Sequence, residues 1–254
     1  MKKSLVTAIA TMLLALSFAT PSFAETCHFD AKADSAINNF LKTDPEIDLV
    51  RYDHLDLTDA EYLKALEEED TTIDEIAFEF EPYSFLLKKG STIDCSSKLT
   101  QDENMMVFMY TVQYFGLFNT ILRKGTEAHK NQIKPMVDLL STALSKLDPY
   151  TGPVARGLKE LSPEVLAAYV HGATVTFDAF TSTTKDLNSN YTKNPTLMLI
   201  TSKTGKDIST LSYHSYEQEV LFDKGASFKV ISVEKKPLAA DNEYLQTVIV
   251  LEEI

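Results

Sequence analysis

The side chains of this chain that could do chemistry together belong to three short motifs in its C-terminal part. Each motif offers a different group: a cation, then hydroxyls, then two carboxylates. In chain order the motifs are Arg156-Gly157, Ser182-Thr183-Thr184 and Glu217-Gln218-Glu219. An arginine grips phosphate oxygens with its planar fork, and carboxylates that lie close together raise the pKa of one of them. The set therefore offers a cation that can bind phosphate, hydroxyls that can orient a neighbouring group and a carboxylate that can stabilise positive charge.

Each motif taken alone is weak evidence. An Arg-Gly pair is most often a surface arginine before a turn, and a Ser-Thr-Thr run is common at a strand edge because threonine favours strands. The chain also contains a second Glu-x-Glu, residues 79–81, with no arginine or Ser-Thr motif ahead of it. The order of the three motifs therefore carries the interpretation.

In this order the motifs resemble the Arg, Ser-Thr-Ser and Glu-x-Glu sites of bacterial mono-ADP-ribosyltransferase toxins of the arginine-specific class. An earlier segment adds to the resemblance, which covers about residues 99–254. It carries Tyr110-Thr111, Tyr114, Asn119 and Leu122-Arg123, similar to the family's pattern on the helix before the catalytic core. Two positions depart from the family: Thr184 replaces the usual third serine, and Ala155 replaces the usual aromatic residue before the arginine. The ring packing of that aromatic must come from elsewhere.

The resemblance implies an enzyme that breaks the N-glycosidic bond of NAD, releases nicotinamide and transfers ADP-ribose to an arginine side chain. It implies that Arg156 holds phosphate and that Gly157 lets the backbone approach the nicotinamide amide. Ser182, with Thr183 beside it at the NAD site, would hold the catalytic Glu219. Glu219 would bind the ribose 2′-hydroxyl and stabilise the sugar cation.

The first glutamate of the third motif has a different implied role. By resemblance, Glu217 positions the acceptor guanidinium and helps to take its proton, a task that a raised pKa makes easier. We expect a strand over residues 216–222, and its period of two would place Glu217 and Glu219 on one face.

Two loops complete the implied site. Residues 208–216 are expected to recognise the acceptor and residues 187–194 to cover NAD. Tyr213 and Tyr191 are the aromatic side chains expected to make contacts there.

The elements that position these residues follow from local composition. Short runs rich in Val, Ile, Thr and Phe predict strands, and three- or four-residue apolar spacing predicts helices. The predicted strands are residues 154–158, 175–180, 196–201, 216–222, 227–233 and 245–252; the predicted helices are residues 31–42, 58–70, 73–88, 101–124, 135–147 and 162–171. A helical front and a β-rich back indicate an α+β fold. The resemblance makes it a helical N-terminal lobe followed by a mixed β-sandwich that holds NAD between its sheets.

Three segments are predicted along the chain. Residues 1–24 are typical of a secretory signal peptide, with a basic start, an apolar stretch too short to span a membrane comfortably and a small-x-small end. Residues 25–98 form an N-terminal helical extension, and residues 99–254 the ADP-ribosyltransferase catalytic domain. An exported protein favours a disulfide between Cys27 and Cys95, the two cysteines of the chain, although two free buried thiols remain the alternative.

Charge and missing motifs exclude other classes of function. The chain has 37 acidic and 24 basic residues, a net charge of −13, which disfavours nucleic-acid or anionic-membrane binding. The five histidines lack metal-ligand spacing and there is no Gly-x-Gly-x-x-Gly, so no metal and no Rossmann-type NAD site is expected. We therefore predict a secreted toxin or effector that modifies a host protein. The alternatives are an NAD glycohydrolase that uses water as acceptor and a non-catalytic secreted binding module.

Overall fold

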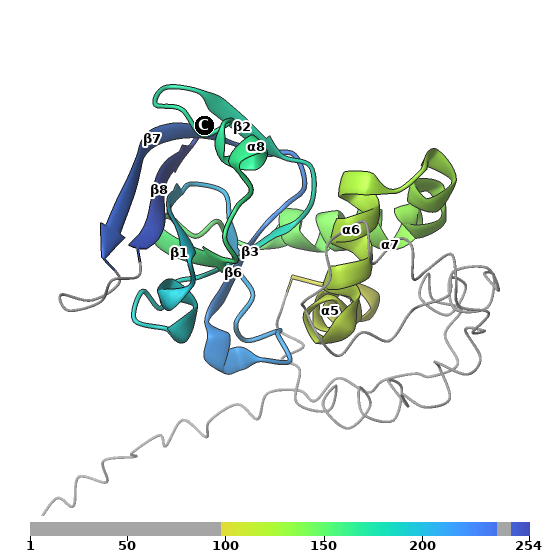
Figure 1. The fold of residues 1–254 in the computed structure, drawn as a ribbon. Coiled ribbons are helices and arrows are strands. Elements are labelled where there is room, and N and C mark those ends of the chain that lie inside the picture. The colour runs from red at the N-terminus through yellow and green to blue at the C-terminus, as the bar shows by residue number, and fades with distance from the viewer. Residues whose placement is uncertain (1–97, 238–244) are drawn as a thin grey trace, which may run out of the picture.

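The computed structural model describes residues 98–237 and 245–254, in which helices come first and strands follow (Figure 1). Several predictions lie outside these residues. They are the signal peptide at 1–24, the helices at 31–42, 58–70 and 73–88, the second Glu-x-Glu at 79–81, and the Cys27–Cys95 disulfide. The extension at 25–98 and the boundary at residue 99 stay predictions.

The strands form one mixed sheet of eight, in the order β2-β7-β8-β4-β1-β3-β6-β5. They are β1 (Gly152–Leu158), β2 (Thr174–Phe177), β3 (Thr181–Thr184), β4 (Thr196–Ser202), β5 (Lys206–Asp207), β6 (Glu219–Phe222), β7 (Ala226–Pro237) and β8 (Leu245–Glu253). β4 and β8 run parallel, whereas the other neighbours are antiparallel. The predicted α+β class and the mixed β-structure are confirmed. The predicted strand at 175–180 ends at Phe177, the one at 216–222 begins only at Glu219, and the short β5 was not predicted.

The strands that carry the first two motifs, β1 and β3, are paired through a single pair of residues. β1 pairs with β4 along its whole length, from Gly152 opposite Ser202 to Leu158 opposite Thr196. On its other edge β1 pairs with β3 only through Ala155 opposite Thr184. Backbone pairing is therefore sparse between the strand that carries Arg156 and the strand that carries Ser182.

The helical part is one predicted helix broken into three pieces, followed by a long helix. These pieces are α5 (Gln101–Met109), the π-helical turn η1 (Tyr110–Tyr114), α6 (Phe115–Lys124) and then α7 (Glu127–Lys146). The helical segments Asp102–Val112 and Phe115–Lys124, which adjoin within the π turn, are bent by 85° relative to each other. α7 begins before the predicted residue 135 because Thr126 caps it, accepting a hydrogen bond from the His129 N–H at 3.2 Å. The predicted helix at 162–171 shrinks to α8 (Pro163–Leu166), with Ser162 as its cap.

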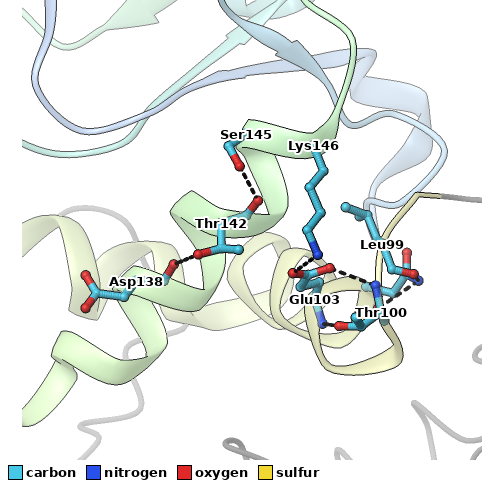
Figure 2. Close-up of polar contacts among 8 residues, drawn as sticks. Leu99, Thr100, Glu103, Asp138, Thr142, Ser145 and Lys146 are labelled. Carbon is cyan, nitrogen blue, oxygen red and sulfur yellow. Dashed lines mark hydrogen bonds and ion pairs between the residues drawn. The ribbon is translucent and has the colours of Figure 1, made fainter.

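A capping box starts α5 and ties it to α7 (Figure 2). The Thr100 N–H donates to Glu103 Oε2 at 2.7 Å, and the Glu103 N–H donates to the Thr100 hydroxyl at 3.3 Å. Lys146, at the end of α7, donates to Glu103 Oε1 at 2.6 Å. Because Glu103 is buried, this ion pair fixes the first turn of α5 against the last turn of α7.

Two apolar clusters hold the fold together. One lies within the sheet and includes Val154, Val220 and Phe228. The other is centred on the helices, but it also takes in Phe180, which precedes β3, and Leu221 from β6. Figure 1 accordingly shows α5 and α6 beside the end of the sheet where β3 and β6 lie. The helices are thereby placed against the strands that carry the second and third motifs.

Within residues 98–237 and 245–254, no single helix is long and apolar enough to cross a membrane. The two arms at Asp102–Val112 and Phe115–Lys124 meet the length and composition criteria only as a pair. Most of their apolar residues belong to the helical core cluster.

Candidate active site

Arg156 is attached to the strand that carries Ser182. The Arg156 side chain is half-buried, and its Nη1 donates a hydrogen bond to the Ser182 backbone carbonyl at 2.7 Å. A guanidinium carries five N–H groups, so one such bond fixes its plane while leaving donors for a second partner. Strand β3 thus orients the first motif.

Tyr110 and Ser182 connect the helices to Glu219. The Asn119 amide donates to the Tyr110 hydroxyl at 3.0 Å. The Ser182 hydroxyl lies close enough to Tyr110 and Glu219 to act on the pKa of each, and it lowers both, as a donor to the charged form does. When Glu219 is ionised it can only accept, so Ser182 is a hydroxyl that can donate to it. The Ser182 side chain is thus placed to orient the carboxylate.

The π turn is part of this arrangement. Tyr110 is its first residue and is fully buried, with its ring edge-on to Phe180 at 5.5 Å between centroids. Asn119 is buried on the next helix, and its Oδ1 has no hydrogen-bond partner. π turns inside helices are often found at functional sites. Here the turn accompanies a bend that lets two successive helical segments supply one hydrogen-bond chain.

Glu219 is the strongly perturbed acid of the site. It is 6% exposed, and burial, the largest cause, raises its pKa from 4.5 to about 7. The Glu217 charge also raises this pKa, whereas the Ser182 hydrogen bond and the Arg156 charge lower it. The sequence predicts that closeness of the two carboxylates raises one pKa, to the benefit of Glu217. In the structure the pKa of Glu219 is raised, and burial of its carboxyl raises that pKa more than the nearby Glu217 charge does.

The prediction that both glutamates lie on one strand face is wrong. Glu217 ends a 3₁₀ turn, η3 (Ser215–Glu217), and β6 begins two residues later at Glu219. Between them Gln218 adopts a left-handed conformation with φ +48°. The Thr184 hydroxyl donates to the Glu217 carbonyl at 2.7 Å, and the Lys185 N–H donates to the Gln218 carbonyl at 3.1 Å. These bonds from the end of β3 hold the turn that a continuous strand would have replaced.

The three residues of the second motif do different things. Thr184 lies opposite Glu219 and Ser182 opposite Leu221, so Ser182 and Glu219 are diagonal neighbours on one face. Thr183 points to the other face, where its hydroxyl donates to the Val220 carbonyl at 2.6 Å. The structure therefore brings Ser182 to the site and gives Thr184 a place in shaping the turn. It does not bring the Thr183 side chain there.

Gly157 lies against the segment predicted to cover NAD. A Cβ at Gly157 would come within 1.9 Å of the Tyr191 carbonyl oxygen and 2.7 Å of Asn194 Nδ2. The 3₁₀ turn η2 (Asn190–Lys193) therefore packs directly on β1. The Tyr191 hydroxyl donates to Glu217 Oε1 at 2.6 Å. Tyr191 thus touches both the first and the third motif, a link with no local signal in the sequence.

The loop at residues 208–216 presents a different tyrosine from the expected one. The ring of Tyr213 packs edge-on against Phe108 at 5.8 Å, and its N–H donates to the Thr111 hydroxyl at 2.9 Å. Tyr216 is 73% exposed and contacts His214 through ring packing and a 3.1 Å hydrogen bond. Tyr213 therefore anchors the loop to the helices, and Tyr216 is its exposed aromatic residue beside Glu217.

Tyr169 is an aromatic neighbour of Arg156 that the sequence did not single out. The two side chains are close enough for the charge on each to shift the pKa of the other. Ala155, where an aromatic residue is usual in the family that the motifs resemble, is buried and pairs with Thr184. Tyr169 follows α8 and is an aromatic residue near the arginine. Among the described residues, no group of three or more His, Cys, Asp or Glu side chains could hold a metal ion.

Comparison with known proteins identifies relatives of this chain. Residues 53–245 match the family model described as NAD:arginine ADP-ribosyltransferase, a match that begins inside the segment predicted as an extension. A Mycobacterium avium (strain 104) protein, named as the NAD(+)–arginine ADP-ribosyltransferase Mav, is 36% identical over 137 residues. That alignment covers 53% of this chain but 16% of the relative.

Solved structures share the fold. Exoenzyme S from Pseudomonas aeruginosa, in complex with human 14-3-3 protein beta and bound to carba-NAD, superposes with a TM-score of 0.56 at 21% identity. The match covers 71% of this chain and 86% of that one. The ADP-ribosyltransferase HopU1 of Pseudomonas syringae has a TM-score of 0.51 at 23% identity, covering 74% of this chain and 90% of that one.

Proposed function

The chain belongs to the NAD:arginine ADP-ribosyltransferase family, and on that premise we propose that it transfers ADP-ribose from NAD to an arginine side chain of a host protein. The observation that carries the proposal is the convergence of the three motifs. The Arg156 guanidinium bonds to the Ser182 backbone, and both Arg156 and the Ser182 side chain lie close enough to Glu219 to lower its pKa. The closeness of a cation, a hydroxyl and a buried carboxyl supports the roles proposed for them.

These groups suit the first half of the reaction. The bond between ribose C1′ and the nicotinamide nitrogen breaks, and nicotinamide leaves with the electron pair, so that the ribose becomes an oxocarbenium ion. The Glu219 carboxylate faces little competing solvent and can stabilise that cation strongly, because charges interact more in a water-poor site. Arg156 would bind the pyrophosphate through its remaining N–H groups.

The second half of the reaction needs an acceptor. A guanidinium nitrogen attacks C1′ and loses a proton, which Glu217 would accept, since it is close enough to Glu219 for its charge to raise the Glu219 pKa. The Glu217 side chain is half-buried at the end of η3, so it is open to a group that arrives from solvent. Tyr216, next to it and exposed, would contact the protein that carries the acceptor arginine.

Radiolabelled or biotinylated NAD with host-cell lysate tests the proposal. Labelled protein bands are expected with the wild-type chain and not with Glu219→Ala. The bands should lose their label under a treatment that cleaves the bond between ADP-ribose and arginine. Glu81→Ala is a matched control, since it alters the other Glu-x-Glu and should label normally. Free ADP-ribose without labelled protein would instead identify a glycohydrolase. The absence of nicotinamide release would favour a non-catalytic binding module.

Export is the remaining part of the proposal. Residues 1–24 would direct secretion and be removed, and the mature chain would act on a host protein as an effector or toxin. Sequencing the N-terminus of the exported protein tests this, with Glu25 expected as the first residue. A mature protein that still begins at Met1 would contradict it.

A further inference from the structure

Tyr191 joins parts of the site that the sequence keeps far apart. Its carbonyl packs on Gly157 of β1, and its hydroxyl donates to Glu217 at 2.6 Å. The contact is made by a tyrosine ring, which has two side-chain torsions, to a glutamate, which has three. Because the glutamate is the more flexible partner, the tyrosine can hold it in one orientation.

The segment that carries Tyr191 is firmly anchored at its C-terminal end. The buried Gln246 side chain on β8 donates from Nε2 to the carbonyls of Thr192 and Asn194, each at 2.7 Å. The Thr247 N–H then donates to the Pro195 carbonyl at 2.9 Å. Three hydrogen bonds from β8 therefore fix residues 192–195. We call residues 189–195 the strap.

The N-terminal end of the strap is tied to the second motif. The Ser189 N–H donates to the Asp186 carbonyl at 3.1 Å, and the Asp186 N–H donates to the Thr184 hydroxyl at 3.0 Å. The same Thr184 hydroxyl donates to the Glu217 carbonyl. The backbone of Glu217 and the strap thus share one anchor, and Tyr191 adds a second link at the carboxyl group.

We infer that Tyr191 is a positioning residue for transfer, holding the Glu217 carboxyl in place for the acceptor guanidinium. This inference rests on the proposed function and extends it to a residue outside the three motifs. Burial and the Glu217 hydrogen bond raise the pKa of Tyr191, so its hydroxyl stays protonated and remains a donor. Glu219 is fixed separately, on strand β6 opposite Thr184 and close to Ser182, so the bond-breaking step is expected to survive loss of the Tyr191 hydroxyl.

The test compares two activities of the same enzyme. Nicotinamide release without acceptor reports hydrolysis of NAD, and formation of ADP-ribosyl-agmatine reports transfer to a small guanidinium. Tyr191→Phe removes one hydroxyl and is expected to lower the kcat of transfer about tenfold, the effect of losing a hydrogen bond to a charged group. Hydrolysis should fall much less than transfer, because phenylalanine keeps the ring that is expected to contact NAD. A merely structural role would lower both activities together.

Two further variants sharpen the test. Gln246→Met removes the strap's anchor far from the reacting atoms and should shift the ratio of transfer to hydrolysis in the same direction, to a smaller extent. Tyr150→Phe removes a phenol hydroxyl whose bond to the Pro153 carbonyl is a long 3.5 Å, and should leave the ratio unchanged. An unaltered ratio in Tyr191→Phe, with normal nicotinamide release, would overturn this inference alone. No nicotinamide release by the wild-type chain would overturn the proposed function, and this inference with it.

Discussion

Two neighbouring regions of the site are built in opposite ways. The centre, made of Arg156, Ser182 and Glu219, lies on strands, and its carboxyl is 6% exposed. The rim, made of Tyr191, Tyr216 and Glu217, lies on 3₁₀ turns. Tyr216 is 73% exposed and Tyr191 45% exposed. Two carboxylates that are two residues apart thus have different surroundings.

The difference suits what each region would meet in the proposed reaction. A developing sugar cation is stabilised most by a carboxylate that is removed from water and held still. An acceptor arginine on another protein arrives from solvent, so the group that receives it must lie at the surface. One left-handed residue, Gln218, separates the two environments. This one residue joins the exposed 3₁₀ turn, which ends at Glu217, to the buried strand, which begins at Glu219.

Replacing Glu219 by glutamine should have the largest effect, because it removes the charge from the centre and keeps the shape. Both hydrolysis and transfer are expected to fall by about 10³-fold, the scale of losing one well-placed electrostatic group. Nicotinamide release and labelling of agmatine measure the two losses. If hydrolysis survives in Glu219→Gln, the centre has been assigned to the wrong carboxyl.

The same variant should be more stable than the wild-type chain at alkaline pH. The folded-state pKa of Glu219 is raised to about 7 from a reference value of 4.5. Its contribution to stability is therefore full below about pH 4.5 and is lost as pH rises through 7. Glutamine does not titrate, so Glu219→Gln should gain on the order of 2 kcal/mol relative to wild type between pH 5 and pH 8. Urea unfolding at both pH values measures it, and an equal difference at the two would contradict burial as the cause.

Glu217→Gln should affect the rim alone. Transfer to agmatine is expected to fall about 10²-fold, the lower end of the range for losing a general base, while hydrolysis changes little. Parallel assays of nicotinamide release and ADP-ribosyl-agmatine measure the split. Equal losses of both activities would remove the distinction between centre and rim.

The pH profile of hydrolysis should report the centre. The carboxylate form of Glu219 is the active one, so kcat/KM for NAD hydrolysis should rise about tenfold per unit up to pH 7 and then level off. Ser182 lowers this pKa by hydrogen bonding to the charged form, so Ser182→Ala should move the midpoint to higher pH. A midpoint that stays fixed in Ser182→Ala would show that the profile belongs to another group.

The residues of the centre and Glu217 of the rim were named from their resemblance to a known family, but the turn that separates the two regions was not predicted. Arg156, Ser182 and Glu219 sit in or beside runs of strand-forming residues, and backbone pairing of β3 with β6 then places two of them together. The turn at Gln218 has no such local signal, since glutamine is not a turn residue like glycine or asparagine. It depends on bonds from Thr184 and Lys185, more than 30 residues earlier in the chain.

The helices show the same division. The Met and Tyr spacing at residues 101–124 predicted a helix, but not its π turn, which lies where Tyr110 reaches Ser182. The helix predicted at 135–147 starts earlier, at Glu127, although the threonine at 126 is a capping signal in the sequence, and Pro135 lies inside the helix. The expected contact of Tyr191 with NAD stays a prediction, whereas the bond from its hydroxyl to Glu217 was not expected.

The smallest expected effect tests the residue that separates the two regions. Gln218 has an exposed side chain and φ +48°, so substitutions there act through the backbone. Gln218→Gly should leave the free energy of unfolding within about 1 kcal/mol of wild type, because glycine adopts positive φ freely but costs chain entropy. Gln218→Val should lose about 1–2 kcal/mol, since a β-branched residue is disfavoured in the left-handed region. Urea unfolding of the pair measures the difference. Equal stability of the two variants would mean that the backbone is extended at this residue, and that both glutamates share one strand face after all.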